Sequence, residues 1–123
     1  MKAAHLQQGE EAEAACYHYL KSQGLKLVEK NFNSRFGEID IIMLDKAMLV
    51  FVEVRFRKNN QFGGALESIT PSKQNKLRKT AELYLQKNTQ HKNARFDVVS
   101  MSQNTQTSVN KQAYTFDWIP NAF

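Results

Sequence analysis

The chain has 123 residues, of which 41% are hydrophobic and 24% are charged, and its net charge at pH 7 is +5. This size and composition predict one globular domain spanning residues 1–123, and a single cysteine, Cys16, excludes a disulfide framework or a cysteine-rich zinc site. No segment reaches the roughly 18 apolar residues of a membrane span, and the first residues lack the apolar core of a signal peptide. We therefore expect a cytoplasmic protein without a membrane partner, whose positive charge weakly favours a polyanion.

The predicted elements follow the order α-β-β-β-α-β-β. A first helix is expected over residues 5–23, because the segment is rich in alanine and glutamate and Gly24 stands where a helix would end. A second helix begins at Thr70 and Pro71, since threonine is a good N-cap and proline suits the first helical position. The expected strands cover residues 25–32, 37–44, 48–57, 95–101 and 113–119. This order predicts a mixed α/β domain with a central β-sheet flanked by helices.

Two acids, Asp40 and Glu53, lie inside strands whose neighbouring residues are mostly apolar. An ionised carboxylate in such a strand is costly unless it is paired, hydrogen-bonded or bound to a metal. If the strands join through a two-residue turn, Lys46-Ala47, Asp40 lies opposite Glu53 with Cβ atoms about 5 Å apart. Like charges in that position destabilise a sheet, so a cation should lie between them, either Arg55 or a divalent metal ion.

In this register, strict alternation divides the hairpin into two faces. One face carries only apolar pairs, with Ile39 and Ile41 on the same side, and the other carries both acids.

The first helix adds a third acid, Glu13. It lies in the middle of a stripe of residues spaced by three or four positions, which share one helix face: Leu6, Gly9, Glu13, Cys16 and Leu20. A carboxylate on the face that covers the sheet can complete a metal site, because Mg²⁺ prefers oxygen ligands. For each acid alone, an edge position or half of a salt bridge is the ordinary alternative. Three acids from three elements that can converge favour the metal site.

The spacing of the acids resembles the PD-(D/E)xK nuclease superfamily: GEID is followed, twelve residues later, by EVR, with an acid on the preceding helix. More closely, the chain is similar almost end to end to the YraN family of uncharacterised bacterial proteins, through GEIDII, LVFVEVRFR, FGGALESIT and RFDVV. The resemblance implies a restriction-endonuclease-like fold and a Mg²⁺- or Mn²⁺-dependent endonuclease. Glu13, Asp40 and Glu53 match its metal-binding and catalytic acids. The helix-borne acid also resembles the arrangement in archaeal Holliday-junction resolvases.

The chain departs from the superfamily pattern at Arg55, where the family has a lysine. A lysine can lose its proton and activate the attacking water, whereas an arginine stays charged and can only hold phosphate or stabilise negative charge. In some nucleases of the superfamily a helix residue takes over part of the lysine's work. Lys73 and Gln74 at the start of the second helix are candidates for this role, and a solvated first helical turn is the ordinary alternative.

Basic residues follow the acids along the chain, with Arg57 and Lys58 at the end of the third strand and Lys73 and Lys76 on the second helix. Tracking of phosphates needs such spread positive charge, although a solvated helix face also explains each lysine. Aromatic residues near the acids could stack on unpaired bases or anchor the core and loops: Phe36, Phe56 and Phe62.

Three functions are compatible with these observations. The first is a metal-dependent endonuclease acting on DNA rather than RNA, including branched or structured DNA. The second is a nucleic-acid-binding module that keeps the fold and has lost the reaction, which Arg55 supports. The third is a protein-interaction domain whose acids are neutralised by Arg55 and Arg57. The sequence does not distinguish a duplex, a single strand, a flap or a four-way junction, and it leaves open whether the chain forms a homodimer.

Overall fold

The computed structural model describes residues 4–57, 66–103 and 114–123, and in the first helix it describes side chains from residue 9 onward. The elements follow the predicted order. They are α1 (Ala4–Ser22), β1 (Lys26–Ser34), β2 (Gly37–Asp45), β3 (Met48–Arg57), α2 (Pro71–Lys87), β4 (Ala94–Gln103) and β5 (Tyr114–Ile119). The strands form one sheet in the order β1-β2-β3-β4-β5, in which β3 and β4 are parallel and the other neighbours antiparallel.

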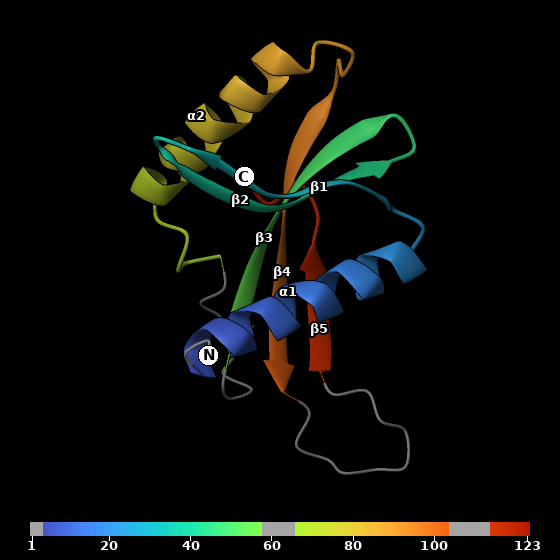
Figure 1. Ribbon diagram of the computed structural model, residues 1–123, viewed down its shortest axis with the longest axis vertical. Coiled ribbons are helices and arrows are strands. Elements are labelled where there is room, and N and C mark those ends of the chain that lie inside the picture. The colour runs from blue at the N-terminus through green and yellow to red at the C-terminus, as the bar shows by residue number, and fades with distance from the viewer. Residues whose placement is uncertain (1–3, 58–65, 104–113) are drawn as a thin grey trace.

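The two helices cover opposite faces of this sheet (Figure 1). Cys16 and Leu20 of α1 pack on one face, in a cluster that includes Ile41 and Val52. On the other face, the α2 cluster includes Tyr84 and the residues Leu77, Ala81, Ile42 and Phe51. A mixed five-stranded sheet flanked in this way is the restriction-endonuclease-like arrangement that the resemblance implied. Of the helices that the structure describes, neither combines the length and the apolar character needed to cross a membrane.

Local sequence signals set the ends of the elements as predicted. The Thr70 hydroxyl accepts a hydrogen bond from the Lys73 backbone N–H at 3.2 Å, and Pro71 is the first residue of α2. Gly24 follows α1 with a φ of +103°, a left-handed conformation that glycine adopts without steric cost.

The β2–β3 hairpin has the predicted register, but its ladder stops short of the acids. Residues pair from Asp45–Met48 to Ile41–Val52, and no backbone pair follows among the described residues of these two strands. The Val54 N–H instead donates to Asp40 Oδ2 at 2.9 Å. A side-chain carboxylate thus takes the place of the next backbone acceptor, and the two strands separate at Asp40.

The predicted alternation along β2 is wrong beyond this point. Ile39 does not share a face with Ile41, because it packs in the α2 cluster with Ile42. On the neighbouring strand, Asn31 adopts a φ of +54°, and Lys30 and Phe32 on either side of it contact opposite helices. The alternation therefore shifts by one residue where β2 passes Asn31. This shift turns Asp40 away from the α2 face, where strict alternation would have placed it, and toward α1.

Candidate active site

Asp40 lies at the centre of the acidic residues, where β2 leaves β3. The carboxylates of Glu13 on α1 and of Glu38 and Asp40 on β2 each offer an oxygen, and these oxygens lie within 4.8 Å of one another. With its amide oriented to satisfy both groups, Asn31 donates through Nδ2 to Glu13 Oε1 and to Glu38 Oε1, each at 3.1 Å. Three carboxylates from two elements thus converge around Asp40, and one side-chain amide links two of them.

Glu53 approaches Asp40 from the other face of the sheet. It pairs in register with Val98 of the α2 cluster, while its neighbour Val54 packs with the α1 cluster. The Glu53 carboxyl is nevertheless hydrogen-bonded to that of Asp40. The structure thus places Glu53 beside Asp40, as the sequence predicted, but through their side chains rather than as a backbone pair.

Arg55 lies beside Glu53, with Nη2 3.0 Å from Glu53 Oε2. Both side chains are largely buried, at 25% and 17% exposed. The buried Arg55 Nε has no hydrogen-bond partner within the part of the chain that the structure describes. Arg55 therefore compensates part of the acidic charge and retains one buried N–H donor without an acceptor among the described residues.

Burial and mutual repulsion raise the pKa values of these carboxyl groups and so favour their protonated form. Burial raises the pKa of Glu13 to about 7, and the neighbouring Asp40 and Glu38 carboxylates add to the rise. Burial also raises the pKa of Glu53 to about 8, again with a contribution from Asp40. The pKa values of Asp40 and Glu38 are raised in the same direction, chiefly by burial. Acids held together at this cost are typical of functional sites and of sites that receive a cation.

The other predicted site residues are distributed around this centre. Lys73 lowers the pKa of Glu53 by its charge, and its Nζ donates to the Ser68 carbonyl at 3.4 Å. Gln74 is half-buried, and its Nε2 donates to the Ile69 carbonyl at 3.1 Å. Lys76 is exposed and lines a separate groove. Arg57 ends β3, half-buried, and Lys58 lies outside the described residues.

Comparison with known proteins identifies the family. The model of Uncharacterised protein family UPF0102 matches residues 12–101, which include Glu13, Asp40 and Glu53. The chain belongs to this family. A UPF0102 protein from Nitrosococcus oceani is 44% identical over 123 residues, 98% of this chain and 94% of the relative.

Two further UPF0102 relatives are similar over most of the chain. One from Alcanivorax borkumensis is 44% identical over 117 residues, 94% of this chain and 90% of the relative. One from Photobacterium profundum is 51% identical over 98 residues, which cover 77% of this chain and 78% of the relative. The predicted membership of a family of uncharacterised bacterial proteins is confirmed. The names of these relatives give the family and no activity.

Sequence reasoning missed two residues of the acidic centre in this UPF0102 chain. Glu38 is not among the ligands predicted from the sequence, although its position two residues from Asp40 on the same strand is a usable signal. Asn31 is not among the site residues predicted from the sequence, although it links two of the acids in the structure. Its left-handed conformation depends on the β1–β2 pairing, and asparagine is one of the few non-glycine residues that adopt it readily.

The acidic centre predicts that the contribution of Glu13 to the stability of the metal-free protein decreases as the pH rises toward neutrality. The pKa of Glu13 is about 7 in the folded protein, against 4.5 for an ordinary glutamate. Between these two pH values the folded state holds more protons than the unfolded state, so this residue's contribution to stability falls as the pH rises and stays low above pH 7. In EDTA, Glu13→Gln should raise the melting temperature at pH 8 by about 3–6 °C, which corresponds to roughly 1 kcal/mol, and change it little at pH 4.5.

Thermal melts monitored by circular dichroism at several pH values measure this effect. Glutamine keeps the Oε1 acceptor for the Asn31 amide, so the comparison isolates the charge. Glu11→Gln is the matched control, because Glu11 is exposed on the same helix. A melting temperature that Glu13→Gln lowers at pH 8, or changes equally at both pH values, would contradict the prediction.

Proposed function

We propose that this protein is a metal-dependent endonuclease that hydrolyses phosphodiester bonds in DNA. The observation that carries the proposal is the convergence of the Glu13, Glu38 and Asp40 carboxylates within 4.8 Å, with Glu53 hydrogen-bonded to Asp40 and Arg55 beside it. Paired acids that hold a divalent ion next to a fixed cation form an arrangement that can catalyse phosphodiester hydrolysis.

The donor set fits a hard divalent cation such as Mg²⁺ or Mn²⁺. Its potential ligand atoms are carboxylate oxygens, which hard cations prefer. Burial raises the pKa of the nearby Cys16 thiol to about 12, so this residue does not supply the thiolate that softer metals prefer. Clustered, partly desolvated carboxylates repel one another, and a cation removes that repulsion. Glu13, Glu38 and Asp40 would hold the ion on the α1 side, and Glu53 would approach it beside Asp40.

A bound Mg²⁺ or Mn²⁺ would lower the pKa of a coordinated water and neutralise charge developing on the phosphate. The chain's own residues supply position and charge. The Val54 N–H fixes the Asp40 carboxylate, and Asn31 links Glu13 to Glu38. An arginine side chain stays protonated in proteins, so Arg55 would stabilise negative charge on a phosphate oxygen and would not accept a proton from water.

One observation favours a second function, a nucleic-acid-binding module without catalysis. Arg55 occupies the place where the superfamily lysine would stand, and it is paired with Glu53 at 3.0 Å. If this ion pair replaces the metal, the protein binds nucleic acid in a salt-sensitive manner and cuts nothing.

Cleavage of a labelled DNA panel tests the proposal. Single-stranded, duplex, flap and four-way-junction DNA are incubated with the protein in Mn²⁺, in Mg²⁺ or in EDTA. We expect cutting that requires the metal and that falls about 100-fold or more in Glu53→Gln, because one carboxylate charge at the metal is lost. Glutamine retains the shape and the hydrogen-bonding atoms of the side chain, so the fold should persist.

Glu82→Gln, at an exposed position on α2, is the matched control and should cut like the wild type. Equal cutting by Glu53→Gln and wild type would mean that the activity belongs to a contaminant. A gel shift of DNA without cutting, in the presence of either metal, would favour the binding module.

A further inference from the structure

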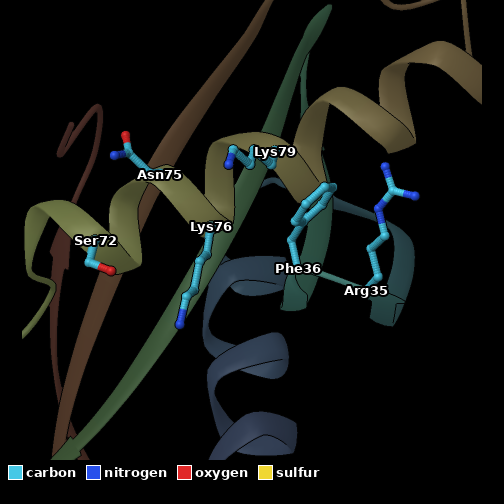
Figure 2. A pocket seen from close by; sticks show the side chains of 6 residues that line it. All are labelled: Arg35, Phe36, Ser72, Asn75, Lys76 and Lys79. Atoms are coloured by element: carbon cyan, nitrogen blue, oxygen red, sulfur yellow. The ribbon is translucent and has the colours of Figure 1, made fainter.

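A basic groove lies between the turn that joins β1 to β2 and the first half of α2 (Figure 2). Its volume is about 610 Å³, within the range of about 300–1,000 Å³ that is usual for ligand pockets. The lining residues come from these two elements: Arg35, Phe36, Ser72, Asn75, Lys76 and Lys79. Three of them are cations and none is an acid, so the groove is suited to a polyanion.

The turn is fixed against α2 by hydrogen bonds rather than by the groove residues themselves. The Ser34 and Thr80 hydroxyls lie 2.8 Å apart, and Thr80 is fully buried. Ser34 Oγ also accepts from the Phe36 N–H at 3.0 Å and donates to the Gly37 carbonyl at 3.2 Å. The turn therefore presents Arg35 and Phe36 to the groove in a defined position, which lowers the entropic cost of binding a ligand there.

The Phe36 ring lies between two of the cations in the view of Figure 2. The Arg35 guanidinium carbon is 4.8 Å from the ring centroid, and Lys79 Nζ is 5.3 Å from it. These contacts use the charge of both groups but not their N–H donors, which stay available for phosphate oxygens. Among the described residues, Arg35, Lys76 and Lys79 form no ion pair with an acid.

An aromatic ring with cations around it is the combination that binds unpaired nucleotides. A base can displace one of these exposed cations from the ring face and stack there, while the cations contact the phosphates on either side, whatever the sequence. In a duplex the bases are stacked on one another, so the cations could reach phosphates but the ring could not reach a base. The pairing of Phe36 with the cations thus distinguishes a single strand from a duplex.

We propose that this groove binds single-stranded DNA, with an unpaired base on Phe36 and the adjoining phosphates on Arg35, Lys76 and Lys79. The groove is continuous in sequence with the acidic centre, because Phe36 is two residues from Glu38 and the hairpin pairs Asn33 with Glu38. The groove and the acids thus lie near the same end of the β1–β2 hairpin, the groove on its α2 side and the acids on its α1 side. The inference rests on the proposed function, since it names the form of DNA that the acids would cut: DNA with an unpaired segment beside the cleavage point.

Fluorescence anisotropy in EDTA tests the groove separately from catalysis. A labelled 12-nucleotide single strand and the duplex of the same sequence are titrated with wild-type protein and with Phe36→Leu. Leucine keeps an apolar side chain but removes the stacking surface. We expect Phe36→Leu to weaken single-strand binding by about fivefold or more and to leave duplex binding within about twofold.

Lys79→Gln tests the phosphate contact and keeps the proposal falsifiable if Phe36→Leu does not fold. It should weaken binding and lower the slope of log affinity against log salt by about 0.7 for the single strand. Lys87→Gln, the same change at an exposed position in the last turn of α2, is the control and should alter both quantities much less.

Three outcomes would overturn the inference: unchanged single-strand affinity in Phe36→Leu, an equal loss for single strand and duplex, or a Lys79→Gln effect no greater than that of Lys87→Gln. Each leaves the nuclease proposal standing if metal-dependent cutting is still lost in Glu53→Gln. Conversely, single-strand binding through Phe36 without any cutting would support the groove and contradict the nuclease.

Discussion

The Asp40→Asn variant is expected to lose about 10³-fold or more of its metal-dependent DNA cleavage while remaining folded. Asparagine keeps an Oδ1 acceptor for the Val54 N–H, so the separation of β2 and β3 is preserved. It removes the charge that lies between Glu13 and Glu38 on one side and Glu53 on the other. Charge stabilisation by a metal and its ligands is worth several kcal/mol, and about 4 kcal/mol corresponds to this factor.

Initial rates on the best-cut DNA of the panel, at saturating Mn²⁺, measure the loss. Asp117→Asn is the matched control, because Asp117 is an exposed acid on β5 that takes the same chemical change. Circular dichroism and single-strand affinity in EDTA should match the wild type in both variants. A cleavage rate in Asp40→Asn within about tenfold of the wild type would show that this carboxylate does not hold the metal.

Asp97→Ala is expected to lower the stability of the protein by about 3–5 kcal/mol, which corresponds to a melting temperature lower by about 10–20 °C. Asp97 is completely buried on β4, and its carboxylate pairs with the Arg95 guanidinium at 3.0 Å. It also accepts from Trp118 Nε1 and from the Asn121 N–H, each at 2.9 Å. Alanine would leave the Trp118 indole N–H and the Asn121 backbone N–H without their acceptor, and Arg95 would remain paired with Asp45 alone.

Urea unfolding monitored by Trp118 fluorescence and circular dichroism measures the loss. Asp117→Asn again serves as the control and should change the unfolding free energy by less than about 0.5 kcal/mol. Metal-dependent cleavage at a temperature where Asp97→Ala is still folded should equal that of the wild type. A loss below about 1 kcal/mol, or a loss of cleavage in the folded variant, would contradict the structural role assigned to Asp97.

A comparison of Asp97 with Asp40 shows which features of a buried acid can be predicted from the sequence and which cannot. Both are acids within apolar strands, so the cost of burying a carboxylate applies to both. Asp97 is neutralised and fully hydrogen-bonded by residues close to it in the sheet and at the C-terminal end. Asp40 is surrounded by further acids, with one cation close to Glu53. Only the tertiary arrangement distinguishes Asp97, which has a structural role, from Asp40, which belongs to the candidate site.

The fold was predictable because its signals are local. The Thr70 cap, Pro71 and the glycine after α1 mark helix ends by short-range chemistry, and the apolar patterns of β2 and β3 set the hairpin register. The pairing from Asp45–Met48 to Ile41–Val52 follows the predicted register, although Lys46 is an unusual residue for its left-handed turn position. Hairpin register is determined by the turn length and the buried face together, and both are readable from sequence.

The geometry of the site was less predictable because it depends on an irregularity between two strands. Strict alternation placed Asp40 on the α2 face, where it could not have met Glu13 of α1. The left-handed Asn31 and the shift in β2 bring the two acids together and bring in Glu38 as well. No two-residue period encodes such a shift, so the residues around Asp40 could be named from the sequence but their arrangement could not.

The binding of Mn²⁺ itself tests most directly whether the acids around Asp40 form a metal centre. Mn²⁺ is titrated into wild type and Asp40→Asn at pH 7.5, and the loss of the free-ion signal is followed by electron paramagnetic resonance. We expect the wild type to bind about one Mn²⁺ per chain, in competition with Mg²⁺, and Asp40→Asn to bind it at least about tenfold more weakly. Absence of Mn²⁺ binding by the folded wild type, or equal binding by the two proteins, would contradict the claim that these acids form a metal centre.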